Sequence, residues 1–171
     1  MSNWFNRYDR AVERLSHWAG VAAGLCVLAV AFIVVYEIIM RGLFRSPTEW
    51  VLEISTYLII VAGFLGLAVT LRKHGHIKVD FIQGRLSRRT RHVLDIITTV
   101  LSIVVFAVFV VESAELVRQS HEFNKLSPSI LRFPLWIPQL SLVIGSTLLF
   151  LELIRQLWST VLEFNRGGRG D

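Results

Sequence analysis

The sequence predicts an all-α integral membrane protein with four transmembrane helices, and its composition and charge distribution support this. Hydrophobic residues without glycine make up 53% of the 171 residues, and charged residues only 18%, whereas soluble domains have about 25% charged residues. Four stretches contain no Asp, Glu, Lys or Arg, and each approaches the roughly 20 residues that a helix needs to cross a bilayer. These charge-free stretches are residues 15–36, 54–71, 96–111 and 133–151.

With their flanking turns, these stretches predict four membrane-spanning helices in a single domain, residues 1–163, followed by a flexible tail at 164–171. A soluble bundle of buried helices is the alternative, but four such stretches in so short a chain count against it. The first stretch is longer than the apolar core of a cleavable signal peptide, so it is expected to remain in the protein as a membrane anchor. The predicted helices are about 15–40, 48–71, 93–117 and 134–158.

The positions of the basic residues predict the orientation of the chain. Thirteen of the 18 Lys and Arg residues lie in the amino-terminal tail, the second connection and the carboxy-terminal end, and five lie in the first and third connections. Basic residues accumulate on the cytoplasmic side of membrane proteins, so both termini are expected to be cytoplasmic. Nucleic-acid binding is another interpretation of a basic chain, but here the bases border the predicted spans.

The first connection, residues 42–46, is short enough to predict an antiparallel hairpin of the first two helices. Ser46 is expected to cap the second helix, with Pro47 at its first position and Glu49 completing a capping box.

The second connection has an apolar spacing of three and four residues among many arginines, which predicts an amphipathic interfacial helix at about 80–91. A disordered basic loop is the alternative there.

Every Asp, Glu, Lys and Arg is expected to lie near a predicted helix end, which is unlike the core of a transporter or pump. Glu37 and Arg41 are four residues apart, and Glu115 and Arg118 are three apart, so each pair is expected to form an ion pair. This favours interfacial salt bridges over a transport relay. The deepest carboxylates are expected to be those of Glu37, Glu53, Glu112 and Glu115, all on the outer side.

No pattern in the sequence indicates catalysis or a bound cofactor or metal. Haem bound in a helix bundle needs histidines that face one another, whereas all five histidines fall at helix ends or in connections. Cys26, the single cysteine, is most simply a small apolar residue of the first helix. The chain is therefore expected not to be an enzyme. The histidines are His17, His74, His76, His92 and His121.

Pairs of small residues four positions apart indicate where helices can approach closely in lipid. They occur in the first, second and fourth predicted helices and do not show whether the contact is within the chain or with another subunit. The pairs are Gly20 with Gly24, Ala62 with Gly66, and Ser141 with Gly145.

Two segments carry a distinctive order of aromatic, charged, glycine and proline residues. They are Glu49, Trp50, Glu53, Tyr57, Gly66, Arg72, Gly75, His76 and Asp80, then Pro134, Trp136 and Pro138. These segments resemble the small (Q-type, DctQ-like) permease subunit of tripartite ATP-independent periplasmic (TRAP) transporters. The family's usual Thr-Pro pair is absent, because this chain has Ile130-Leu131-Arg132 there, and Ser129 is similar to the serine that often precedes it. A glycine that commonly follows the last proline is matched only later, by Gly145.

The resemblance implies a multi-pass subunit of the bacterial inner membrane that binds a large transport subunit and stiffens its static scaffold. The large subunit would use a sodium gradient to take up an organic acid delivered by a periplasmic binding protein. Trp50 and Trp136 would lie at the outer interface, and Arg72, His76 and Asp80 would fix the turn after the second helix. Residues expected to contribute to docking of the binding protein are Arg41, Arg45, Glu112, Glu115 and Glu122.

Two other functions remain open from the residues. One is a membrane anchor of a redox enzyme, which the lack of facing histidines disfavours. The other is a small oligomeric exporter or channel that works without other subunits. That class generally needs a carboxylate near the middle of a span, and the sequence places none there.

Overall fold

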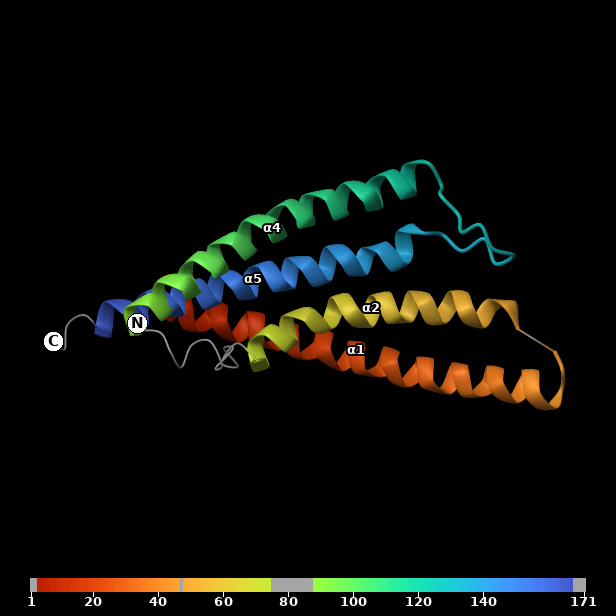
Figure 1. Ribbon diagram of the computed structural model, residues 1–171. Coiled ribbons are helices and arrows are strands. Elements are labelled where there is room, and N and C mark those ends of the chain that lie inside the picture. The colour runs from red at the N-terminus through yellow and green to blue at the C-terminus, as the bar shows by residue number, and fades with distance from the viewer. Residues whose placement is uncertain (1–2, 47, 75–87, 168–171) are drawn as a thin grey trace.

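The computed structural model describes residues 3–46, 48–74 and 88–167, and within these ranges the chain is helical except for two connections (Figure 1). Each helix is long and apolar enough to cross a membrane, which confirms the predicted all-α, four-span class. In the same ranges the β-structure is a single bridge between Leu126 and Pro134. The helices are α1 (Asn3–Leu43), α2 (Glu49–His74), α4 (Arg88–Glu122) and α5 (Trp136–Gly167).

The helices form two hairpins that pack through α2 and α5. α1 packs on α2 and α4 packs on α5, each pair antiparallel, and α2 and α5 run side by side in the same direction. The helices therefore lie in the order α1, α2, α5, α4, as Figure 1 shows. The start of α1 and the end of α5 lie at one end of the layer, and the connections at 44–48 and 123–135 lie at the other.

Each helix begins at a residue other than the predicted one, with α4 starting at Arg88 in place of 93 and α5 at Trp136 in place of 134. α1 begins at Asn3, well before the predicted residue 15, because the charged side chains of its early turns bind those of α2 and α5. α2 begins at Glu49. Thr48, and not the predicted Ser46, therefore immediately precedes this helix, and its backbone N–H and hydroxyl donate to Glu37.

Two predicted segments fall partly outside the described residues. The interfacial helix expected at about 80–91 lies there up to residue 87, and residues 88–91 form the first turn of α4. α5 continues to Gly167, into the segment 164–171 that the sequence predicts to be a tail.

The tightly packed part of the molecule lies where α1, α2 and α5 meet. Ala19, Ala68 and Leu148 form a buried cluster there, with Leu65 packed against it. Alanines at these positions let the helix backbones approach closely, which is how helices associate in lipid. The outer faces of α1 and α4, in contrast, expose many large apolar side chains.

The glycines of the predicted packing pairs differ in their surroundings. A Cβ at Gly145 of α5 would collide with the backbone carbonyl of Phe64 in α2, and a Cβ at Gly20 would lie 2.7 Å from Val69 Cγ2. A Cβ at Gly66 would meet Ala23 at an ordinary 3.9 Å. At Gly24 nothing lies within 4 Å of the added Cβ, so this glycine makes no close contact with another helix among the residues that the structure describes. Of their partners, Ala62 and Ser141 are buried.

Candidate functional site

Two groups of polar residues lie where α2 begins, and the first joins it to the end of α1. The buried carboxylate of Glu37 binds the Arg41 guanidinium with an N–O distance of 2.7 Å. It also accepts hydrogen bonds from the Thr48 backbone and hydroxyl. The predicted Glu37–Arg41 ion pair is confirmed, and the hydrogen bonds from Thr48 to Glu37 close the first hairpin.

The second group joins α2 to the connection at 123–135. The buried carboxylate of Glu53 accepts hydrogen bonds from the Tyr57 hydroxyl, at 2.7 Å, and from the Ser129 hydroxyl. Ser129 lies 2.8 Å from the Ser127 hydroxyl. The Tyr57 ring packs 5.4 Å from the ring of Phe133, centroid to centroid. Glu53 and Tyr57, one helical turn apart, thus hold the connection against the start of α2.

The connection itself is an ordered turn. The Ser127 N–H donates to the Phe133 carbonyl at 2.9 Å, and the Leu135 N–H donates to the Lys125 carbonyl at 3.0 Å. The turn includes a left-handed residue, Arg132, with φ of 44°. These bonds place the loop in one conformation beside Glu53.

A third polar cluster lies toward the opposite end of the layer and centres on Arg72 of α2. Its guanidinium binds the carboxylates of Asp9 at 3.1 Å and of Glu13 at 3.4 Å, both from α1. It also binds Glu152 of α5 at 3.4 Å. One arginine therefore joins three helices.

Glu152 is the centre of the α5 side of this cluster, and its side chain is 0% exposed. Arg155, one turn later, binds it at 2.6 Å and reaches Asp9 at 3.8 Å. The Tyr8 hydroxyl of α1 donates to the Leu151 carbonyl of α5 at 2.9 Å. A buried carboxylate is tolerated only when it is paired and hydrogen-bonded, and here two arginines satisfy Glu152.

The positions of these clusters along α2 match the two boundaries of a bilayer. Glu53 and Arg72 are 19 residues apart, which at 1.5 Å per residue is about 28 Å along a helix. The hydrocarbon core is about 30 Å thick. The segment of α2 between them contains no charged residue, so the polar clusters lie near the two surfaces.

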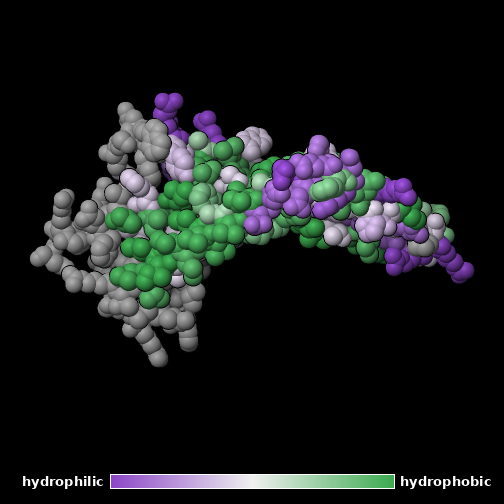
Figure 2. Space-filling model, turned by 90° about the horizontal axis from the view of Figure 1, so that it is seen from above, coloured by the Kyte–Doolittle hydropathy of each residue, from purple (hydrophilic) through white to green (hydrophobic). Residues whose placement is uncertain are grey.

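The charged residues predicted to dock a partner lie at the end with the connections. Arg118 binds Glu115 at 2.6 Å and Glu122 at 3.0 Å, which confirms the predicted pair of Glu115 and Arg118. Glu112 is exposed, and Arg45 is exposed with a left-handed φ of 53°. Figure 2 shows hydrophilic residues gathered toward this end and hydrophobic residues over the middle of the same face.

The other predicted residues are near these groups. Glu49 is the exposed first residue of α2, and the ring of Trp50 lies 6.1 Å from that of Tyr36 in α1. The ring of Trp136 lies 5.5 Å from His121, which joins the ends of α4 and α5.

Both prolines lie at the start of α5. Pro134 precedes the helix, and Pro138 is buried in its first turn. Gly75, His76 and Asp80 lie outside the described residues, so the predicted turn they would fix lies outside them too.

The structure adds a buried charged residue to those that the sequence indicated. Glu152, which the sequence reading did not single out, is more buried than Glu37 or Glu53, and it lies at the other end of the layer. Arg72, which the resemblance predicts to fix the turn after α2, also binds α1 and α5, and that turn lies outside the described residues.

The cluster residues that sequence reasoning missed carried only a weak signal. Asp9 and Glu13 are four residues apart, and Glu152 and Arg155 are three apart, which places each pair on one helix face. Such spacing is common on solvated helices and does not reveal a partner helix.

Together these features define a class of protein. Each buried carboxylate in the described ranges, namely Glu37, Glu53 and Glu152, is bonded to side chains within the chain. In those ranges no three His, Cys, Asp or Glu residues are grouped to hold a metal ion. The fold is therefore that of a small helical membrane subunit whose buried charges join its own helices.

Comparison with known proteins identifies the family. A family model described as the DctQ component of tripartite ATP-independent periplasmic transporters matches residues 30–163. The chain belongs to this family, and it is a small TRAP membrane subunit of the bacterial inner membrane. This agrees with the resemblance noted in the α2 and α5 motifs.

Two curated relatives are TRAP transporter permeases. The sialic acid TRAP transporter permease protein SiaT of Haemophilus influenzae (strain 86-028NP) is 27% identical over 99 residues, which cover 58% of this chain and 16% of the relative. The isethionate TRAP transporter permease protein DctMQ of Oleidesulfovibrio alaskensis (strain ATCC BAA-1058 / DSM 17464 / G20) is 26% identical over 137 residues, which cover 77% of this chain and 21% of the relative. The chain thus spans about a fifth or less of the length of these relatives.

Proposed function

We propose that this chain is the scaffold subunit of a TRAP transporter, which binds a large membrane subunit and does not itself carry the substrate. The observation that carries this proposal is that each of the three buried carboxylates in the described ranges bonds to another element of the chain itself. A side chain that moves an ion must exchange partners during transport. Carboxylates bonded between fixed helices instead hold those helices in place.

The large membrane subunit is proposed as the partner because the chain leaves wide apolar surfaces uncovered. α1 and α4 are the outer helices of the layer, and each exposes large apolar side chains along its length. Apolar area in a span can face lipid or another subunit, and the relatives are permeases several times longer than the matched segment. A rigid layer of four helices would brace a larger moving neighbour.

The substrate class follows only from the relatives. One is named for sialic acid and the other for isethionate, and both compounds are organic acids. We propose that the complete system takes up an organic acid, with the sodium gradient used by the large subunit.

A periplasmic binding protein is proposed to dock at the end of the layer that carries the connections 44–48 and 123–135. This requires both termini to be cytoplasmic, as the distribution of basic residues predicts. Exposed charges of both signs lie there, including Arg45 and the Arg118 group. Such charges steer the encounter of two proteins.

The proposal is tested by purifying the chain from its native membrane in mild detergent and identifying by mass spectrometry what accompanies it. We expect a stoichiometric hydrophobic partner of many spans, and reconstituted chain without that partner should transport nothing. A partner that carries haem or flavin would instead indicate a redox anchor. Transport by the chain without a partner would contradict the scaffold function.

A further inference from the structure

The outer face of α1 near its start carries three arginines around a hollow in the surface. Arg7, Arg10 and Arg14 are three and four residues apart, so they lie on one face of the helix. With Ala11 they line an open hollow of about 330 Å³, and all three arginines are exposed. The small side chain of Ala11 leaves room between the guanidinium groups for a ligand.

The acidic residues of the same segment lie on another face. Asp9 binds Arg72 and Arg155, and Glu13 binds Arg72. These carboxylates therefore point toward α2 and α5. The charges of α1 are thus segregated, with the positive ones gathered at the hollow. Such a concentration of positive charge favours an anionic ligand.

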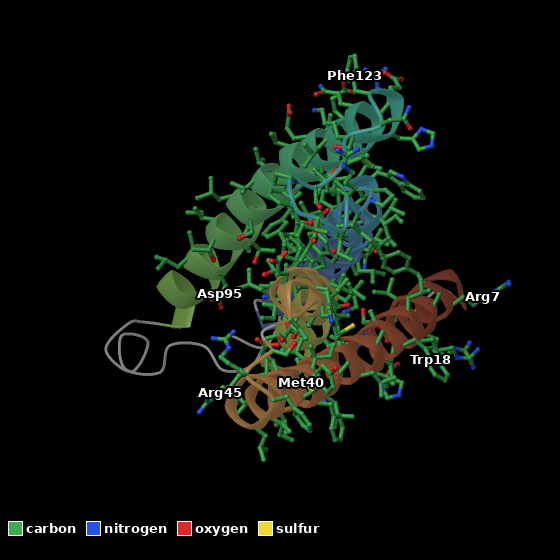
Figure 3. The ribbon with its side chains drawn as sticks, turned by 90° about the vertical axis from the view of Figure 1, so that its right-hand side faces the viewer. Arg7, Trp18, Met40, Arg45, Asp95 and Phe123 are labelled. Carbon is green, nitrogen blue, oxygen red and sulfur yellow. The ribbon has the colours of Figure 1, made fainter. Side chains whose placement is uncertain are left out.

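The same face of α1 becomes aromatic and then apolar along the helix. Trp18 is one turn beyond Arg14 and is 70% exposed. Figure 3 shows Arg7 and Trp18 turned away from the neighbouring helices. Leu25 and Phe32 follow at seven-residue steps, and both are exposed. Arginine, tryptophan and apolar residues in this order match the headgroup, interface and acyl-chain regions of one leaflet.

We propose that this face of α1 binds an anionic phospholipid in the leaflet at the end that carries the chain termini. The phosphate would lie in the hollow, where guanidinium groups can form paired hydrogen bonds to its oxygens. Trp18 would lie at the level of the glycerol, and an acyl chain would run along Leu25 and Phe32. A free phosphate would use the arginines but would not need the apolar strip, so the continuous face favours a lipid.

The test measures retained lipid by native mass spectrometry of the full chain, purified with whatever subunit accompanies it. Phosphatidylglycerol or phosphatidylcholine is titrated into the detergent. The natural protein is compared with a triple variant, Arg7→Gln, Arg10→Gln and Arg14→Gln. A basic residue near the membrane surface contributes about fivefold to the binding of anionic lipid. We therefore expect the apparent Kd for phosphatidylglycerol to rise roughly 100-fold, with phosphatidylcholine unaffected.

Two matched variants distinguish lipid binding at this site from a general effect of the protein's net charge. Arg45→Gln, Lys125→Gln and Arg132→Gln remove the same charge from exposed positions at the opposite end, and binding should stay within about twofold of the natural protein, well under the effect of one arginine. Lysine at positions 7, 10 and 14 keeps the charge and should retain most of the affinity. If the lysine variant retains its affinity for the lipid, the loss of affinity in the glutamine variant is caused by the missing charge and not by misfolding.

A second readout tests the acyl part of the site. Phosphatidylglycerol brominated on its acyl chains should quench tryptophan fluorescence in the natural protein, and less so after Trp18→Phe. Glycerol phosphate, as a soluble probe, should not displace the lipid. Equal retention of phosphatidylglycerol by the natural protein and the glutamine variant would overturn the proposal, as would displacement by glycerol phosphate or quenching that Trp18→Phe leaves unchanged.

Discussion

A single carboxylate, that of Glu152, connects three of the four helices. It is fully buried and binds Arg155 of its own helix and Arg72 of α2, which in turn binds Asp9 of α1. A charge in such a position is stable only with its partners, because the bilayer and the packed helices offer it no water. The group therefore specifies how α1, α2 and α5 are rotated relative to one another.

We expect Glu152→Gln to destabilise the protein by about 3 kcal/mol, because it removes the fully buried member of the ion pairs with Arg72 and Arg155. The free energy of unfolding, measured by titration with sodium dodecyl sulfate, checks this. Glu122→Gln is the matched control, because Glu122 is about half exposed and pairs with Arg118. Its effect should stay below about 1 kcal/mol. Equal effects of the two substitutions would show that Glu152 does not hold the helices.

Contacts between elements depend on a few small residues. Gly145 lets α5 approach α2 so closely that any Cβ would collide with the Phe64 backbone. Gly24, four positions after Gly20 in α1, has open space around it. The two glycines carry the same sequence signal but differ in their packing.

The contrast predicts that Gly145→Ala destabilises the protein by about 1–3 kcal/mol, since the added methyl group must push two helices apart. Gly24→Ala should leave the stability unchanged or slightly raised, because alanine favours a helix more than glycine does. Thermal unfolding in detergent compares the two variants. If Gly24→Ala were the more damaging, Gly24 would be identified as a contact to another subunit.

The connection at 123–135 is held to α2 by the side chains of Glu53 and Ser129. Replacing Ser129 by alanine removes its hydrogen bond to Glu53 and its contacts with the Ser127 hydroxyl and the Leu131 N–H. The bond to Glu53 by itself contributes about 1 kcal/mol. We expect the backbone amides of Ser127 and Leu135 to exchange hydrogen roughly fivefold faster as a result. Hydrogen exchange with mass spectrometry measures this. The control is Thr56→Ala, because the Thr56 hydroxyl donates to the Leu52 carbonyl of its own helix. Unchanged hydrogen exchange in Ser129→Ala would show that Glu53 does not hold the loop.

The whole molecule is a layer of two hairpins with its polar groups at the two ends and a wide apolar belt between them. α2 and α5 are the inner helices, and α1 and α4 present apolar side chains outward. This arrangement suits a subunit that braces a neighbour in the membrane and presents charged loops at the surface.

Docking through those loops predicts a salt-dependent effect on transport. In vesicles that contain the large subunit and the binding protein, Arg45→Glu with Glu122→Lys should raise the KM for loaded binding protein several-fold at low salt. The difference should diminish as salt screens the charges. Lys73→Glu, exposed at the other end of α2, is the control and should leave KM unchanged. If the double reversal leaves KM unchanged at every salt concentration, Arg45 and Glu122 do not contribute to docking.

The sequence determined the features that depend on one segment at a time. Charge-free stretches of about 20 residues predicted the four spans, and spacings of three and four predicted the Glu37–Arg41 and Glu115–Arg118 pairs. The motifs around Glu53 and Trp136 indicated the family. Each of these follows from the helical repeat or from the thickness of the bilayer, so no neighbouring helix has to be known.

Only the tertiary structure decided which helix each face meets. It placed Arg72 against Asp9 and Glu152, distinguished Gly145 from Gly24, and brought Ser129 onto Glu53 across 76 residues of chain. A helical repeat specifies the direction of a side chain around its own axis. The rotation and neighbours of that axis are settled by the packing of all four helices together, which no local pattern contains.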